Sequence, residues 1–259
     1  MKTVETEKAR DVTSAFLENM VEEAGADGVV VGLSGGIDSS TAVSLAVDVL
    51  GPEKVQGLVM PSEVTTDQNL RDATDLAEDL GIDHDVISID PIVDRFVESL
   101  SGVQDTEAIG NLRARSRMVL EYYQANRENL LVLGTGNRSE LLIGYFTKYG
   151  DGAVDISPLA GLYKTEVREL ARDLGVDEYL IQKQPTAGLW EGQTDEDELG
   201  ASYEVIDKVL FCIADKGLSV DETAETTGTD QELVEKFKKM YLASEHKRTT
   251  PEYPEFDRD

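Results

Sequence analysis

Cysteine, histidine and tryptophan are scarce in this sequence of 259 residues, which contains one cysteine, two histidines and one tryptophan. A single cysteine cannot form an internal disulfide, so a secreted fold built on disulfides is excluded. Cys212 lies in an apolar helical pattern, and we expect it to be a core residue rather than a nucleophile. With two histidines and no spaced cysteine pair, a structural zinc site is not expected.

Long apolar runs are also absent. No segment approaches the roughly 18 consecutive apolar residues of a membrane span. Residues 1–8 lack the apolar centre of a signal peptide. We therefore expect a cytoplasmic protein that does not bind a membrane.

Basic residues are few, because 24 Lys and Arg residues stand against 52 Asp and Glu residues, for a formal net charge of −28. This excess of carboxylates opposes binding to nucleic acid phosphates as a main activity. The acids are spread through every expected helix, which is typical of proteins adapted to high salt. Where positive charge does gather in such a chain, it indicates a binding site for an anion.

The spacing of apolar residues predicts an α/β fold. Four apolar runs of strand length are separated by segments with helical periodicity, which is typical of a parallel sheet. The expected strands are residues 29–33, 55–60, 86–89 and 130–133. The expected helices are residues 4–23, 38–50, 66–80, 108–126, 198–216, 221–226 and 230–244. We predict a three-layer, doubly wound parallel sheet flanked by helices, in a single domain of residues 1–259 with a flexible tail from about residue 248.

Three polar segments follow three of the expected strands. They begin at Ser34, Pro61 and Gly134. Ligands of doubly wound sheets bind beyond the carboxyl ends of the strands, so we expect these segments to meet at one site.

The first of these segments reads Ser-Gly-Gly-Ile-Asp-Ser-Ser, from Ser34 to Ser40, and leads into a helix. Its glycines allow a tight turn, while serine hydroxyls and the unpaired N–H groups of the helix suit a phosphate. It is not a Walker A motif, because no lysine follows the glycines, and it lacks the spacing of the dinucleotide fingerprint. The alternative is an ordinary turn whose serines cap the helix.

A second polar segment runs from Gly134 to Glu140. Its small residues suit the close approach of a nucleotide, and Glu140 is a candidate metal ligand. Taken alone, the same residues fit an ordinary turn followed by a surface acid better.

Two further segments give a specific resemblance. Lys148 begins Lys-Tyr-Gly-Asp-Gly, and residues 158–165 read Pro-Leu-Ala-Gly-Leu-Tyr-Lys-Thr. The loop of residues 34–39 resembles the pyrophosphate loop of enzymes that split ATP between its α and β phosphates. In this order, the segments resemble those of the ammonia-dependent NAD synthetases over nearly the full chain. Because the chain is also strongly acidic, we expect it to come from a halophilic archaeon.

The resemblance implies an adenine nucleotide alpha hydrolase-like fold and a two-step reaction. ATP adenylates the nicotinate carboxylate of deamido-NAD and pyrophosphate leaves, and ammonia then displaces AMP to give NAD⁺. The resemblance also implies Mg²⁺ as cofactor, ATP as co-substrate, and a homodimer with the substrate pocket at its interface.

The same resemblance assigns residues to roles. Asp38 and Lys164 are expected to be catalytic, and Asp38 and Glu140 to bind Mg²⁺. The residues expected to bind ATP are Gly32, Leu33, Ser34, Gly35, Gly36, Ile37, Asp38, Ser39, Ser40, Met60, Thr135, Lys164 and Thr186. The residues expected to bind deamido-NAD are Arg115, Lys148, Asp155, His246 and Lys247.

Some residues near these motifs are interpreted differently. For Arg117 we favour a solvated helix face on which it pairs with nearby acids. Trp190 either pins its loop to the core or reaches the active site. The four acids of residues 195–198 are expected to begin a helix and have no catalytic role.

Two other functions stay open. Related ATP pyrophosphatases that transfer sulfur or modify tRNA are opposed by the single cysteine and the scarcity of basic residues. A nucleotide-binding regulator would not need Asp38, Glu140 and Lys164 together. The length leaves no room for an amidase domain that would use glutamine, so free ammonia is the expected nitrogen donor.

Overall fold

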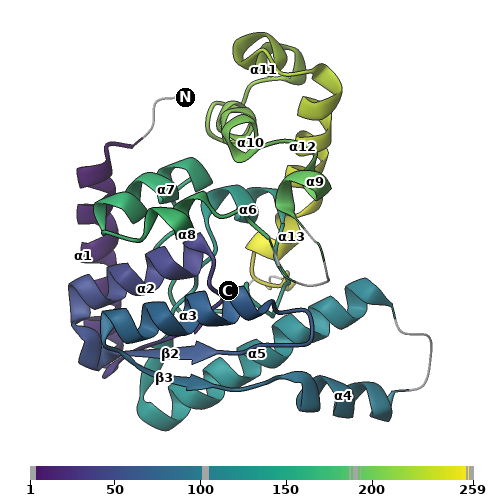
Figure 1. Cartoon of the computed structure of the whole chain (residues 1–259). Coiled ribbons are helices and arrows are strands. Elements are labelled where there is room, and N and C mark those ends of the chain that lie inside the picture. Colours follow the sequence, from purple (N-terminus) through teal and green to yellow (C-terminus); the bar gives the residue numbers. More distant parts are fainter. Residues whose placement is uncertain are drawn as a thin grey trace.

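The computed structural model describes residues 4–100, 105–186, 188, 192, 194–254 and 256 (Figure 1). Its sheet has four parallel strands in the order β3-β2-β1-β4. The strands are β1 (Gly28–Leu33), β2 (Val55–Val59), β3 (Asp83–Val86) and β4 (Leu130–Val132). Because all four run in one direction, their carboxyl ends share one edge of the sheet. The predicted parallel α/β sheet is confirmed.

Helices connect and cover these strands. In chain order they are α1 (Thr6–Ala24), α2 (Ile37–Leu50), α3 (Asp67–Leu80), α4 (Asp90–Ser99), α5 (Thr106–Glu128), α6 (Arg138–Ile143), α7 (Lys164–Asp173), α8 (Glu178–Gln182), α9 (Asp195–Leu199), α10 (Tyr203–Leu210), α11 (Val220–Thr227), α12 (Gln231–Ala243) and α13 (Glu245–Arg248). A π-helical turn, Phe211–Asp215, follows α10.

The side chains of β1 alternate between two apolar layers. Val29 and Val31 pack in a cluster with α1, α2, α3 and α7, whereas Val30 packs with α4 and α5. Helices thus cover both faces of the sheet, which explains why this strand reads as an uninterrupted apolar run. The sheet is the middle of three layers, as predicted.

A separate apolar cluster holds the C-terminal helices together around Tyr203 and Phe237. Helices α10, α11 and α12 stand together at the top of Figure 1, away from β2 and β3. The end of α6 joins this cluster through Leu142 and Ile143, and α10 also packs against α7. The C-terminal helices therefore support α6 and α7, which carry Glu140 and Lys164.

Two expected elements differ from the structure. The third strand is Asp83–Val86 rather than residues 86–89. β3 is an edge strand whose side chains are largely exposed, and the apolar Ile89 after it packs in the layer of α4 and α5 instead. The expected helix of residues 198–216 is divided, because Gly200 takes a left-handed φ of 78° that ends α9.

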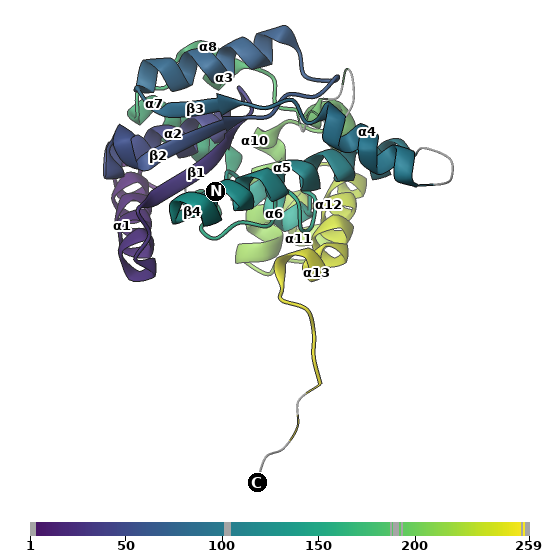
Figure 2. The ribbon, with the colours of Figure 1, turned by 90° about the horizontal axis from the view of Figure 1, so that it is seen from below.

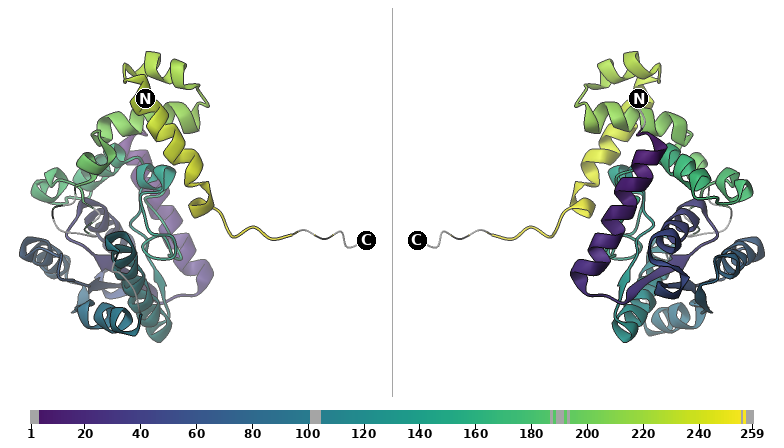
Figure 3. Two further views of the ribbon diagram at one scale, coloured as in Figure 1. Left: turned by 90° about the vertical axis from the view of Figure 1, so that its right-hand side faces the viewer. Right: turned by 90° about the vertical axis from the view of Figure 1, so that its left-hand side faces the viewer.

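Other expectations concern single residues and the chain end. Cys212 is buried, as expected for a core residue. None of the helices in the described ranges is both long and apolar enough to cross a membrane. Residues 249–254 leave the body after α13 (Figures 2 and 3). Arg248, where we expected the tail to begin, ends α13 and donates hydrogen bonds to the carbonyls of Leu142 at 2.7 Å and Tyr241 at 2.8 Å.

Candidate active site

A cavity of about 750 Å³ lies where the strands end. Ser34 after β1, Pro61 after β2 and Gly134 after β4 all line it. The predicted meeting of these three segments is confirmed. A cavity of this size at the carboxyl edge of a parallel sheet is typical of a nucleotide site.

The loop between β1 and α2 is built as an anion-binding turn. Gly35 has a φ of 71°, and a Cβ atom there would collide with the carbonyl oxygen of Asn69 on α3. Ser34 Oγ lies 3.0 Å from Ser39 Oγ and accepts a hydrogen bond from the N–H of Gly36 at 3.2 Å. Gly36 is the N-cap residue of α2 and, as a glycine, has no side chain that could cap the helix. The N–H groups of the first turn therefore remain available to a phosphate.

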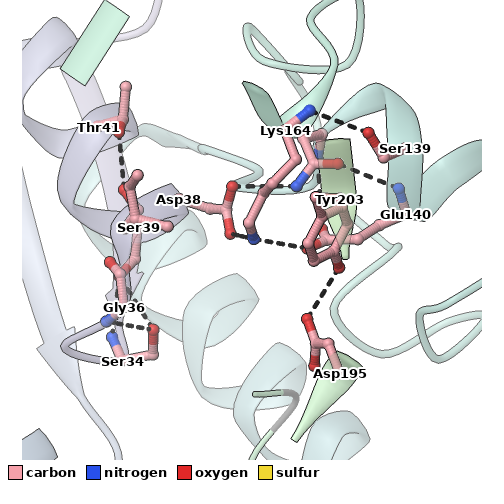
Figure 4. Close-up of polar contacts among 12 residues, drawn as sticks. Ser34, Gly36, Asp38, Ser39, Thr41, Ser139, Glu140, Lys164, Asp195 and Tyr203 are labelled. Carbon is pink, nitrogen blue, oxygen red and sulfur yellow. Dashed lines mark hydrogen bonds and ion pairs between the residues drawn. The ribbon is translucent and has the colours of Figure 1, made fainter. Parts of the chain in front are cut away.

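Asp38, Glu140 and Lys164 form an ion-pair cluster beside this loop (Figure 4). Lys164 Nζ lies 3.0 Å from Glu140 Oε1 and forms a close ion pair with Asp38 Oδ2. Asn137 donates to Asp38 Oδ1 at 3.0 Å and also caps α6, the helix that carries Glu140. The distant helix α2 and the consecutive helices α6 and α7 thus supply one cluster of charge.

The cluster shifts the pKa values of Lys164 and Glu140. Burial by itself lowers the pKa of Lys164, but the carboxylates of Asp38 and Glu140 outweigh it and hold that pKa above its ordinary value. Burial raises the pKa of Glu140 to about 7, with Lys164 opposing the shift and Asp38 adding to it. Lys164, which is 1% exposed, therefore stays positively charged next to the loop.

The backbone around Lys164 is held by buried side chains of other helices. The N–H of Lys164 donates to Ser139 Oγ at 2.9 Å, and the N–H of Thr165 donates to Asp207 Oδ2 at 2.9 Å. Ser139 also donates to Asp207, which is 1% exposed. Asp207 of α10 therefore fastens the first turns of α6 and α7 to each other.

Most residues predicted to bind ATP line the cavity. They are Gly32, Leu33, Ser34, Gly35, Gly36, Ile37, Asp38, Ser39, Met60, Thr135, Lys164 and Thr186. Ser40 is buried within α2 instead, where its hydroxyl donates to the Gly36 carbonyl at 2.8 Å. Glu140 lines the cavity as well. We call the loop of residues 34–39, with Glu140 and Lys164, the phosphate end.

Four of the residues predicted to bind deamido-NAD lie in a second region, which we call the basic end: Arg115, Lys148, His246 and Lys247. Arg115 donates to the Lys148 carbonyl at 3.2 Å, and Lys148 Nζ donates to the His246 carbonyl. Lys247 Nζ donates to the carbonyls of Gly144 at 2.6 Å and Phe146 at 2.8 Å. Lys247 lines the cavity, whereas Arg115 and His246 are exposed outside it.

Asp155, the fifth of those residues, lies apart from this group. Its carboxylate accepts hydrogen bonds from the N–H of Val132 at 2.8 Å and from the hydroxyl of Tyr122 at 3.1 Å. It thus ties the chain after β4 to α5 without lining the cavity. Its part in substrate binding stays a prediction.

Asp38 and Glu140 offer oxygen atoms, which are the ligands that Mg²⁺ takes in sites that bind phosphates. Among the residues the structure describes, no group of three or more His, Cys, Asp or Glu side chains could hold a metal ion. Two carboxylates are enough where substrate phosphates and water complete the shell of Mg²⁺. The donor set therefore fits a magnesium ion that is shared with a phosphate.

Two residues of α5 belong to the site although sequence reasoning missed them. The expectation of a solvated face for Arg117 is wrong, because it lines the cavity and its Nε donates to the Met60 carbonyl at 3.0 Å. Glu121, one turn later, lines the cavity too, and burial together with the Asp151 charge raises its pKa to about 7. Their spacing of four residues places both on one helix face, and this was the available signal.

Two of the acids at the start of α9 lie at the cavity. They begin a helix as expected, yet Asp195 and Glu198 line the cavity. Asp195 accepts a hydrogen bond from the Tyr203 hydroxyl at 2.8 Å, and the centre of that ring lies 5.0 Å from Lys164 Nζ (Figure 4). A run of four acids does not reveal which of them faces inward. Trp190 lies outside the described residues.

The fold and the cavity define a class, that of α/β proteins with a phosphate-binding loop and a lysine–carboxylate cluster at the edge of a parallel sheet. Within this class, the sequence model of the family described as NAD synthase matches residues 10–251, and the chain belongs to that family. An NH3-dependent NAD(+) synthetase of Thermococcus kodakarensis is 49% identical over 256 residues, which cover 99% of this chain and 100% of that protein. One of Halobacterium salinarum is 49% identical over 96% of this chain and 94% of its own.

Solved structures show the same fold. The NMN synthetase of Francisella tularensis has a TM-score of 0.87 and 38% identity, covering 98% of this chain and 100% of its own. The NH3-dependent NAD synthetase of Campylobacter jejuni has a TM-score of 0.83 and 33% identity, with the same coverage of both chains. The expected adenine nucleotide alpha hydrolase-like fold and the family resemblance are confirmed.

Proposed function

We propose that this chain converts deamido-NAD to NAD⁺ with ATP and ammonia, releasing AMP and pyrophosphate. The observation that carries the proposal is the cluster of Lys164, Asp38 and Glu140 beside the uncapped start of α2. The cavity that contains this cluster also reaches Lys247, so one space connects the phosphate end to the basic end. Membership of the NAD synthase family supports the same reaction.

In the first step, a carboxylate oxygen of the nicotinate attacks the α-phosphorus of ATP. The bond from that phosphorus to the bridging oxygen breaks, and pyrophosphate leaves with the electron pair. The N–H groups at the start of α2 and the hydroxyls of Ser34 and Ser39 bind the phosphates. Lys164 stabilises the negative charge that develops in the transition state, because its two carboxylates keep it charged.

Asp38 and Glu140 would hold Mg²⁺ in this step. When bound, the ion offsets the charge of the departing pyrophosphate. Asn137 serves both ligands, because it donates to Asp38 at 3.0 Å and its side chain caps the helix that carries Glu140. Thr135 and Met60 contact the AMP part of ATP, and Thr186 contacts its phosphates.

In the second step, ammonia attacks the carboxyl carbon of the adenylate. The bond from that carbon to the AMP oxygen breaks, and one proton is released as the amide forms. Adenylation makes the step possible because AMP is a far better leaving group than an oxide ion.

Arg115, Lys148, Asp155, His246 and Lys247 bind deamido-NAD. The cations of the basic end attract its phosphates in a chain that is otherwise strongly acidic. Arg115 and His246 are exposed on the single chain. This exposure supports a homodimer in which a second copy covers the bound dinucleotide.

The first experiment follows NAD⁺, AMP and pyrophosphate from ATP, deamido-NAD and ammonium, with Mg²⁺ in high salt. Equal amounts of the three products are expected. Cleavage of ATP without NAD⁺ would exclude deamido-NAD as the acceptor, and a folded protein that does not cleave ATP would overturn the proposal.

A second substrate belongs in the same assay, because a relative with a TM-score of 0.87 is an NMN synthetase. The deamidated mononucleotide is compared with deamido-NAD by kcat/KM. We expect the dinucleotide to be preferred, in agreement with the relatives that are 49% identical. A higher kcat/KM for the mononucleotide would mean that the mononucleotide is the substrate, and the two chemical steps would stay as proposed.

A further inference from the structure

The phosphate end has little positive charge for a ligand as anionic as a triphosphate. Residues 32–40 contain no lysine or arginine. Lys164 lies beside the loop, but Asp38 and Glu140 both pair with it and offset its charge. A further cation of the chain close to the loop would therefore strengthen the binding of a triphosphate beyond what Lys164 and Mg²⁺ supply.

Lys183, which follows α8, lies in that place. Its Nζ donates a hydrogen bond to the Gly35 carbonyl at 2.8 Å and forms an ion pair with Asp72 of α3. Lys183 lines the same cavity as Gly36 and Thr186. Its side chain is 18% exposed, so it is held against the loop instead of extending into solvent.

The partner of Lys183 is itself held in position. Asp72 is 9% exposed, and Gln68 Nε2 donates to its Oδ1 at 2.7 Å while its Oδ2 pairs with Lys183. An ammonium group has three N–H donors. Gly35 and Asp72 account for two of them, which leaves one donor for a ligand bound in the cavity.

We propose that Lys183 is the cation that binds the β- and γ-phosphates of ATP, and then the departing pyrophosphate, at this loop. It thereby does what the lysine of a Walker A loop does, although it comes from a distant segment of the chain. This inference rests on the proposed function, since it names a further contact to the same substrate. AMP has neither of the two phosphates, so its binding is independent of Lys183.

The variant Lys183→Gln removes the charge and keeps a side chain that can donate to the Gly35 carbonyl. Lys183→Arg keeps the charge and tests rescue. Lys239→Gln is the matched control, because Lys239 is exposed on α12 and pairs with Glu235 outside the cavity. All three variants are made in the full chain and checked for folding by circular dichroism.

Binding is measured by calorimetry with Mg²⁺ at several salt concentrations, using AMP, pyrophosphate and an ATP analogue with a methylene bridge between its α and β phosphates. Lys183→Gln should weaken the binding of the analogue and of pyrophosphate about ten- to a hundredfold, the loss expected for one charge-assisted hydrogen bond. AMP binding should not change, Lys183→Arg should recover most of the affinity, and Lys239→Gln should match the natural protein.

Unchanged affinity of Lys183→Gln for the analogue would overturn the proposal. An equal loss for AMP would also overturn it, because Lys183 would then only support the Gly35 turn. If Lys183→Gln does not fold, Asp72→Asn replaces it, with a smaller loss of about threefold or more that is again confined to the analogue and pyrophosphate. These measurements need no turnover, so a failure of NAD⁺ synthesis is seen separately in the assay of the natural protein.

Discussion

The phosphate end and the basic end differ in the groups that pair with their cations. At the phosphate end, Lys164 is buried and pairs with the carboxylates of Asp38 and Glu140. At the basic end, Lys148 and Lys247 donate to backbone carbonyls. A carbonyl orients a cation, but it does not neutralise its charge.

The difference agrees with the ligand that we propose for each end. Within the part of the chain that the structure describes, none of the four residues of the basic end forms an ion pair with a carboxylate. No carboxylate in that part of the chain therefore neutralises the charge of Arg115, Lys148 or Lys247, although the net charge of the chain is −28. The phosphate end is instead prepared for chemistry, with its charged groups fixed in advance.

The strongest test of this comparison removes a carboxylate from the phosphate end. Asp38→Asn should lower the rate of adenylation about 10³-fold, because it weakens the metal site and one of the two ion pairs of Lys164. The measurement is AMP and pyrophosphate formation. Asp48→Asn is the matched control, since Asp48 is on the same helix but pairs with Arg10 at the surface. Normal turnover of Asp38→Asn would show that the phosphate end does not act through this carboxylate.

A smaller effect is expected at Asp207, which holds the backbone next to Lys164 but does not line the cavity. Asp207→Asn keeps the shape of the side chain but replaces an acceptor oxygen with a donor that faces Ser139 or Thr165. We expect the free energy of unfolding to fall by about 2 kcal/mol. We also expect kcat to fall about tenfold at a temperature where the variant stays folded, since Lys164 begins the helix that Asp207 fastens.

Urea unfolding and turnover are measured together for Asp207→Asn. Asp221→Asn at the exposed start of α11 is the control. A loss of stability with unchanged kcat would show that Asp207 supports the fold and does not position the catalytic group.

Much of the loop of residues 34–39 could be predicted from the sequence, because its residues are contiguous. A strand, a glycine–serine turn and a helix follow one another from Gly28 to Leu50, and local rules are enough to predict what they bind. The same holds for the order of strands and helices, since apolar periodicity is local as well. The position of β3 was missed because an edge strand does not need an apolar sequence.

Contacts between distant segments could not be predicted. Lys183 meets Gly35 across 148 positions, and neither residue carries a local signal of the other. The inward direction of Arg117 and Asp195 likewise depends on what packs around them. Burial of a charged side chain is a property of tertiary structure, so composition and spacing do not reveal it.

A third prediction concerns the pH dependence of stability at Glu121, which lines the cavity. Burial raises the pKa of Glu121 to about 7, from an ordinary value of 4.5. The folded state therefore binds this proton more tightly, and the stability that it contributes is lost as the pH rises from about 4.5 to about 7. Glu121→Gln should gain about 3 kcal/mol in the free energy of unfolding, relative to the natural protein, over that interval.

The gain is measured by denaturant unfolding in high salt on both sides of that interval. Glu128→Gln, at the exposed end of the same helix, is the control and should show no such gain. A difference between Glu121→Gln and the natural protein that does not vary with pH would mean that Glu121 is solvated in the folded state.

The smallest effect is expected at the basic end. Arg115 is exposed and donates to a backbone carbonyl, so Arg115→Gln should change the free energy of unfolding by no more than about 0.5 kcal/mol. Because no carboxylate among the described residues neutralises its charge, the same change should raise the KM for deamido-NAD about tenfold and leave the KM for ATP unchanged. Arg127→Gln on the same helix, where Arg127 pairs with Glu128, is the matched control. An equal rise in both KM values would mean that the two ends are not separate, because a cation of the basic end would then also serve the nucleotide at the phosphate end.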